Sequence, residues 1–86
     1  MYSVFLEEEV RRKILSVDKS LTVRFVKAIA ALRVKPAGRH LRHGADCFVV
    51  EMGQYRIAYR CDEKKKEKLV VFIGDHKEYE KWYSGA

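Results

Sequence analysis

Hydrophobic positions recur along the chain with two different periods, and the change of period separates a helical first half from a sheet-forming second half. Between residues 6 and 32, apolar side chains return every three or four positions, as they do on one face of an α-helix. Residues 46–60 instead alternate between large apolar side chains and a more mixed set, which predicts a pair of strands. Residues 69–73 form a continuous apolar run, which predicts a strand covered on both faces.

The first half predicts a short strand and two helices that pack as a hairpin. Residues 2–5 alternate and are rich in β-forming types, which is typical of a strand. Glu7 to Glu9 suit the positive end of the first helix dipole, and Asp18 is the expected N-cap of the second helix. The first apolar stripe is Leu6, Val10, Ile14 and Val17, and the second is Leu21, Phe25, Ala28, Ile29 and Leu32.

Residues 46–60 predict one β-hairpin around a two-residue turn at Gly53-Gln54. Residues directly opposite each other in an antiparallel pair share a face, so this turn determines both faces. The core face pairs Met52 with Tyr55, Val50 with Ile57 and Phe48 with Tyr59. The second face pairs Glu51 with Arg56, Val49 with Ala58 and Cys47 with Arg60, and we interpret it as the floor of a functional groove.

These elements predict one α+β domain over residues 1–86. It has a small antiparallel sheet of about four strands, an N-terminal helical hairpin packed on one face and a short C-terminal helix or turn at residues 75–83. Residues 69–73 are the candidate central strand. Residues 39–44 form a basic connector into the sheet, and residues 62–67 form a charged turn.

Charge adds a preference for a polyanionic partner. Eighteen Lys and Arg against twelve Asp and Glu give a net charge of +6, which favours nucleic acid through steering and counterion release. Neither a signal peptide nor an apolar run near the ~20 residues of a membrane span is present, so we expect a cytoplasmic protein. Cys47 and Cys61 match no metal-ligand spacing, and we expect free thiols, no metal and no cofactor.

Several segments resemble a known family. The runs LRHG (41–44), DCF (46–48) and GQYRIAY (53–59) are similar to the LxG…GxYRlvY segment of the RelE/ParE toxin superfamily. The run VVFIGDHKEY (70–79) resembles the last strand and the H(K/R)xxY-like end of its RelE and HigB branches. The resemblance covers most of the chain and implies the same fold.

The resemblance implies the toxin of a type II toxin–antitoxin system, a ribosome-dependent endoribonuclease that cleaves mRNA and so inhibits translation. The implied partners are the ribosome, the mRNA and a cognate antitoxin that is acidic, partly disordered and wraps the domain. One alternative is a ParE-like toxin that inhibits gyrase without nuclease activity. Another is a non-catalytic RNA-binding module.

Metal-independent cleavage by the ribose 2′-hydroxyl needs a base, a cation for the phosphate charge and an acid for the leaving oxygen. Arg56 is the main candidate cation, because a guanidinium on a rigid strand presents a fixed fork to phosphate, and the resemblance places a phosphate-contacting arginine there. The alternative for Arg56 is a structural ion pair with Glu51. Glu51 is either the base, as in the YoeB-like branch, or a residue that orients Arg56.

Four further residues complete the catalytic candidates. His76 can act as acid or base near neutrality, and Lys77 corresponds to the family's second cation, which is usually arginine. Tyr79 fits the HigB-like and Tyr83 the RelE-like position of a tyrosine that stacks on a base or donates a proton. Val49 and Glu51 stand where some RelE members carry two lysines, so proton transfer must use other groups, or the chain binds without cleaving.

The RNA-binding candidates are basic residues of the connector and of the hairpin. Phosphate contacts of this kind position a nucleic acid without reading its sequence. The alternative for the connector is a solvated basic loop. The candidates are Arg39, Arg42, His43 and Arg60.

Overall fold

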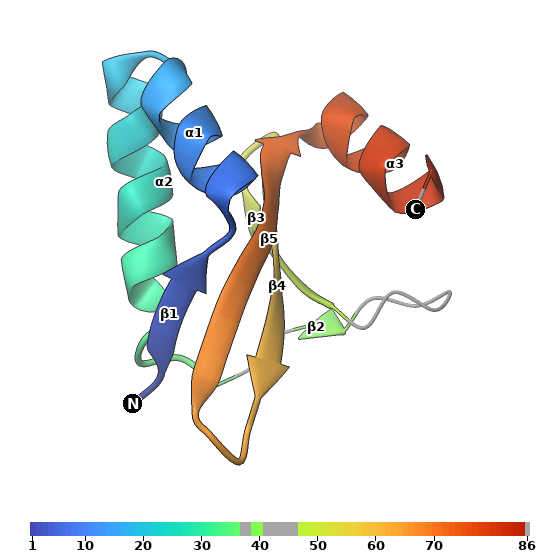
Figure 1. Ribbon diagram of the computed structural model, residues 1–86. Helices are drawn as coiled ribbons and strands as arrows, with labels where there is room; N and C mark the ends of the chain where they lie inside the picture. The colour runs from blue at the N-terminus through green and yellow to red at the C-terminus, as the bar shows by residue number, and fades with distance from the viewer. Residues whose placement is uncertain (37–38, 41–46, 86) are drawn as a thin grey trace.

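The computed structural model describes residues 1–36, 39–40 and 47–85, and it shows a sheet with helices on both sides (Figure 1). Two N-terminal helices stand together on one side of the sheet, and a third helix follows the last strand on the other side. The predicted α+β class, with a helical hairpin and a short C-terminal helix, is confirmed. The elements are β1 (Ser3–Leu6), α1 (Glu8–Ser16), α2 (Lys19–Ala31), β2 (Arg39–His40), β3 (Phe48–Met52), β4 (Tyr55–Asp62), β5 (Glu67–Asp75) and α3 (His76–Gly85).

In the described part of the chain, the sheet has five strands in the order β1-β5-β4-β3-β2. The pairs β2–β3, β3–β4 and β4–β5 are antiparallel, whereas β1 runs parallel to β5. The sequence prediction missed this parallel pair and the two-residue β2, because no local pattern encodes how the two ends of a chain pair. Strand β5 lies between β1 and β4, so the apolar run at residues 69–73 forms an interior strand, although the middle strand of the five is β4.

The two helices of the hairpin pack as their spacing predicts, but Leu6 of the first predicted stripe lies in β1, because α1 begins only at Glu8. Asp18 precedes α2, and its carboxylate accepts a hydrogen bond from the Leu21 backbone N–H at 2.9 Å. This bond satisfies one of the free donors at the start of the helix. The apolar stripes are buried against one face of the sheet, and the main core consists of Val10, Ile14, Phe25, Leu32, Ile57, Tyr59, Val70 and Ile73.

The β3–β4 hairpin has the predicted register. Its turn begins at Gly53, whose φ of 62° lies in the left-handed region that favours glycine. Glycine at the first central position is typical of a type II′ turn, whose twist matches that of the flanking strands. The Cα partners are Phe48 with Tyr59, Val49 with Ala58, Val50 with Ile57, Glu51 with Arg56 and Met52 with Tyr55.

The second face of the hairpin is partly covered by α3, so the interpretation of this face as an open groove floor is wrong over its central row. Val49 is 5% exposed and Ala58 is 0% exposed. The aromatic residues of α3 are three and four positions apart, so they share one helical face and need an apolar surface to cover. The second core cluster consists of Cys47 and Val49, packed against Val71, Tyr79, Trp82 and Tyr83.

Helix α3 is held at its start by a reciprocal cap and by a contact from α1. The Asp75 carboxylate accepts from the Glu78 N–H at 2.8 Å, and the Glu78 carboxylate accepts from the Asp75 N–H at 3.0 Å. This pair is a capping box. The Lys13 ammonium donates to Glu78 at 2.5 Å and lies 5.6 Å from the Phe72 ring centroid, so one lysine joins α1, β5 and α3.

Replacing Glu78 with glutamine should weaken the docking of α3 by about 1 kcal/mol, the typical value of one cap and one exposed ion pair. The hydrogen bonds from Lys13 and from the Asp75 N–H lower the pKa of Glu78. A carboxyl with a lowered pKa stabilises the fold above its ordinary pKa, about 4.3, and this contribution is lost as the pH falls below it. The fluorescence of Trp82, the single tryptophan, should report that loss in an acid titration.

The matched control for this titration is Glu80→Gln. Glu80 lies on the same helix, and its carboxylate is 3.1 Å from Nε2 of the exposed His76. The Trp82 fluorescence of the wild type and of Glu80→Gln should change over the same pH range as the pH falls. Glu78→Gln should show a smaller pH-dependent change in this fluorescence. Identical acid titrations of the wild type and Glu78→Gln would contradict a docking role for the Lys13–Glu78 pair.

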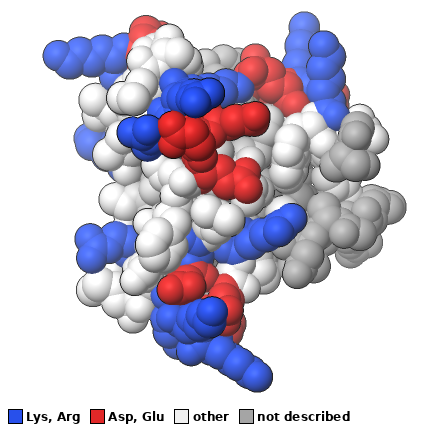
Figure 2. Space-filling view, in the orientation of Figure 1, with Lys and Arg blue, Asp and Glu red and all other residues white. Residues whose placement is uncertain are grey.

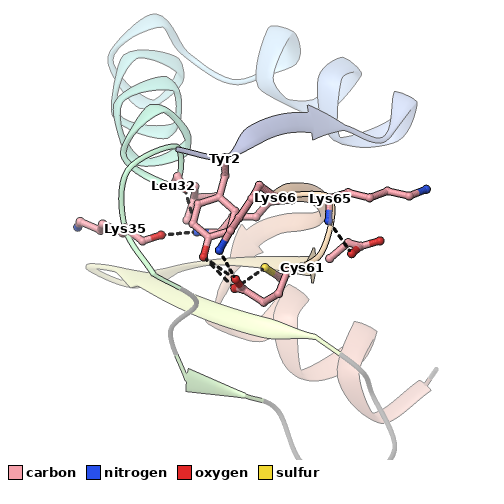
Figure 3. Close-up of polar contacts among 9 residues, drawn as sticks. Tyr2, Leu32, Lys35, Cys61, Lys65 and Lys66 are labelled. Carbon is pink, nitrogen blue, oxygen red and sulfur yellow. Dashed lines mark hydrogen bonds and ion pairs between the residues drawn. The ribbon is translucent and has the colours of Figure 1, made fainter.

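A fully buried lysine, Lys68, lies near the start of β5, at the end of this strand away from α3. Lys68 is 0% exposed, and its ammonium donates to the Leu32 carbonyl at 2.8 Å and to the Lys35 carbonyl at 2.6 Å (Figure 3). It also lies 4.0 Å from the Tyr2 ring centroid and 5.2 Å from that of Tyr59. Burial lowers the pKa of Lys68. The lysine therefore caps the carbonyl end that follows α2 and joins it to Tyr2 in the N-terminal segment and to Tyr59 in β4.

Glu63 organises the surface beside this lysine. Its carboxylate accepts from the Tyr2 hydroxyl at 2.8 Å, from Lys66 at 3.0 Å and from the Cys61 thiol at 3.3 Å (Figure 3). The hydrogen bonds, that of Lys66 first, lower the pKa of Glu63 to about 2. The Tyr2 side chain near the N-terminus is thus tied to the β4–β5 turn by the Glu63 carboxylate.

Candidate nucleic-acid site

Arg56 and Glu51 lie opposite each other at the turn end of the β3–β4 hairpin. The Arg56 Nε is 3.9 Å from a Glu51 carboxylate oxygen, and the side chains are 17% and 52% exposed respectively. Arg56 also donates through Nη1 to the backbone carbonyls of Tyr55 at 3.2 Å and Gly53 at 3.3 Å. The guanidinium is therefore held in place by its own hairpin, and Glu51 is the more accessible partner.

His76 and Lys77 begin α3 directly beside this pair. Arg56 is the Cα partner of Gly74 in β5, and the next residue pair joins Tyr55 to Asp75, immediately before His76. Both side chains are exposed, and His76 Nε2 lies 3.1 Å from a Glu80 carboxylate oxygen one turn further along the helix. The structure therefore brings the candidate base, cations and imidazole to one end of the sheet.

Tyr79 and Tyr83 lie on the sheet-facing side of α3 rather than at the turn end. Their rings stack with centroids 5.9 Å apart and an interplanar angle of 7°. Trp82 stacks on Phe72 with centroids 5.0 Å apart, so it anchors the helix on the sheet. Because the two tyrosines form one stack, the geometry does not separate the HigB-like from the RelE-like position.

The two RNA-binding candidates that the structure describes lie in strands β2 and β4. Arg39 is in β2, opposite Val49 in β3, and Arg42 and His43 lie outside the described residues. Arg60 is exposed and shares a face with Arg56, since residues 56, 58 and 60 alternate on one strand. The buried Ala58 separates the two arginines on that face.

The surface charge is mixed rather than uniformly basic. Figure 2 shows Lys and Arg side chains mainly around the periphery of one face, with acidic side chains clustered between them. Among the described residues, no group of three or more His, Cys, Asp or Glu could hold a metal ion. Cys47 and Cys61 are free thiols and pack into different core clusters, as the register predicts.

Two features of the site were missed by the sequence analysis. One is Lys13, which reaches α3 from a distant helix and leaves no local signal. The other is the cover that α3 places over the hairpin, for which a signal existed. Tyr79, Trp82 and Tyr83 have the spacing of one helical face, and Val49 and Ala58 on the second hairpin face are both apolar.

The helices of the described chain are short: α2, the longest, has 13 residues, and none has the length and apolarity needed to traverse a bilayer.

Comparison with known proteins relates this fold to RelE toxins. No family model matches the sequence, and no curated protein matches it either. In the toxin–antitoxin complex RelBE2 of Mycobacterium tuberculosis, the similar chain has 24% identity and a TM-score of 0.76, over 86% of this chain and 90% of that one. The isolated Escherichia coli RelE toxin has 16% identity and a TM-score of 0.75, over 99% of this chain and 98% of that one. In the archaeal RelE–RelB complex of Pyrococcus horikoshii, the similar chain has 20% identity and a TM-score of 0.74, over 87% of this chain and 94% of that one.

Proposed function

We propose that this chain, which has the RelE toxin fold, is the toxin of a toxin–antitoxin pair and acts as a ribosome-dependent endoribonuclease. The reaction is metal-independent: the ribose 2′-hydroxyl attacks the adjacent phosphorus and the 5′ oxygen leaves. Two of the three similar structures are complexes of a toxin with its antitoxin, which supports an antitoxin partner for this chain as well.

The observation that carries the proposal is the position of Arg56. Its guanidinium is held by two backbone carbonyls and faces a carboxylate, and it lies beside the first turn of α3. Preorganised cations of this kind stabilise charge that develops on a phosphate, because no reorganisation is needed during the reaction. Arg56 would therefore bind the phosphate oxygens in the transition state.

The remaining roles are assigned from chemistry. Glu51 or His76 takes the proton of the 2′-hydroxyl, and Lys77 supplies a second cation at the phosphate. Tyr79 or Tyr83 stacks on a base or protonates the leaving oxygen. The RNA backbone would be positioned by basic residues away from the scissile bond, which are Arg39, Arg42, His43 and Arg60.

Cell-free translation tests this function. Message 5′ ends are mapped by primer extension after adding the purified chain, with and without ribosomes engaged on the same message. New ends only at ribosome-occupied codons would support the proposal. Intact message together with loss of gyrase supercoiling would instead support the ParE-like alternative, and RNA binding without cleavage would support the non-catalytic one.

An apolar groove between the helical hairpin and β1 is the proposed antitoxin contact. The groove has a volume of about 290 Å³, and among the described residues that line it Arg11 and Arg33 carry the charge. Leu15 and Val26 line it and are 72% and 51% exposed. An acidic, amphipathic segment would cover the apolar side chains and place carboxylates near the arginines.

Replacing both Leu15 and Val26 with lysine should weaken antitoxin binding at least tenfold, because two charges would then be buried in an apolar contact. Val34→Lys is the matched control, since Val34 is 67% exposed and does not line the groove. Titration calorimetry with the antitoxin measures the affinity. Equal affinities for the double variant and the control would place the antitoxin elsewhere.

A further inference from the structure

Three side chains form a row across the face of the sheet opposite the helical hairpin. Phe5 in β1 is the Cα partner of Leu69 in β5, and Leu69 is the partner of Arg60 in β4. Phe5 is 50% exposed although it is aromatic, and Arg60 is exposed as well. The row borders a hollow of about 390 Å³ that is also lined by Asp62 and Glu67.

We propose that this hollow is a subsite for one unpaired nucleobase of the bound RNA, with the base stacked on Phe5 and its phosphate on Arg60. The inference rests on the proposed RNA-cleaving function and extends it to a nucleotide away from the scissile bond. Arg56 and Arg60 are four residues apart on one strand face, about 13 Å at 3.3 Å per residue. The subsite therefore lies outside the group of candidate catalytic residues at the turn end.

The charges in the hollow determine how a nucleotide fits. Asp62 and Glu67 are cross-strand partners, so their carboxylates share one side of the hollow, and Arg60 and Leu69 are the neighbouring pair. A phosphate is repelled by the two carboxylates and attracted by the guanidinium. Carboxylates instead accept hydrogen bonds from exocyclic amino groups, such as N4 of cytosine. The subsite should thus favour cytosine over uracil.

RNA is favoured over a protein as the occupant because the row combines an exposed aromatic ring with an arginine. Single-stranded nucleic acids bind to surfaces of this composition by stacking bases on the ring and placing phosphates on the cation. The basic side chains at the adjacent β4–β5 turn add electrostatic attraction. Figure 2 shows Lys and Arg side chains reaching outward at the end of the molecule where this turn lies in Figure 1.

The test is binding of fluorescent oligonucleotides whose riboses are all 2′-O-methylated, so that they lack the attacking hydroxyl and cannot be cleaved. Fluorescence anisotropy gives the affinity for oligocytidine and oligouridine. Phe5→Leu should weaken oligocytidine binding about tenfold, because leucine keeps the apolar contact and removes the stacking. Arg60→Gln should weaken binding to both oligonucleotides and reduce its salt dependence. Val23→Ala, at an exposed position on α2, is the control.

Single abasic positions in the oligocytidine make the test specific. One abasic position should weaken binding to the wild type about tenfold and should have almost no effect on Phe5→Leu, since both changes remove the same stack. Wild-type affinities in Phe5→Leu and Arg60→Gln would overturn the subsite, and the exposed ring would then be better explained by a protein contact. Absence of wild-type binding to either oligonucleotide would overturn it too, while ribosome-dependent cleavage, measured separately, decides the proposed function.

Discussion

Arg56→Ala is expected to lower the rate of ribosome-dependent message cleavage about 100- to 1,000-fold, the usual loss when one preorganised charge-stabilising donor is removed. The Arg56 guanidinium is held in place by its own hairpin, through the Tyr55 and Gly53 carbonyls. Alanine removes both its charge and its geometry. Primer extension on programmed ribosomes measures the rate.

Two further substitutions separate chemistry from folding. Arg56→Lys keeps the charge and loses the planar fork, so it should recover only part of the activity. Glu51→Gln should lower the rate strongly if Glu51 is the base, and only weakly if Glu51 orients Arg56. The midpoint temperature of thermal unfolding of each variant should stay near that of the control Arg12→Ala, which removes an exposed charge on α1. Full activity in Arg56→Ala would exclude the assigned role.

Lys68→Ala is expected to lower the free energy of unfolding by about 3 kcal/mol, because it leaves a buried cavity and removes the hydrogen-bond donor of two carbonyls. That is a large part of the roughly 4–13 kcal/mol expected for a domain of this size. The ammonium caps the Leu32 and Lys35 carbonyls and lies against the Tyr2 ring, so three separate segments depend on it. Urea unfolding measures the change.

Lys68→Met distinguishes packing from charge, because methionine fills much of the same volume without a donor. We expect a smaller loss, about 1–2 kcal/mol, since the carbonyls still lose their hydrogen bonds. Burial lowers the pKa of Lys68, so the unfolded state binds the proton more tightly than the folded state. The stability of the wild type relative to Lys68→Met should therefore rise with pH between the lowered pKa and the ordinary value, near 10.4. A variant as stable as the wild type would show that the cap adds nothing.

The sequence by itself determined the elements whose signals are local. The hairpin register follows from alternation on both sides of Gly53, because cross-strand partners are defined by a turn of two residues. The N-cap at Asp18 and the apolar stripe of α2 follow from helical spacing in the same way. The resemblance of the hairpin and of residues 70–79 to RelE toxins predicted the overall fold, and the comparisons with solved structures confirm that fold.

Only the tertiary structure decided what surrounds the candidate groups. Arg56 was expected on an open face, yet its side chain is 17% exposed and bonded to its own turn. Lys68 carries no sequence signal of burial, because the carbonyls that accept its hydrogen bonds belong to Leu32 and Lys35, more than 30 residues earlier in the chain. Contacts between segments distant in sequence depend on how elements pack, and local residue patterns do not encode that packing. For this reason the residue types of the candidate site could be predicted, and the spacing of the α3 aromatic residues already indicated a covering helical face, while the lysine cap could not be predicted.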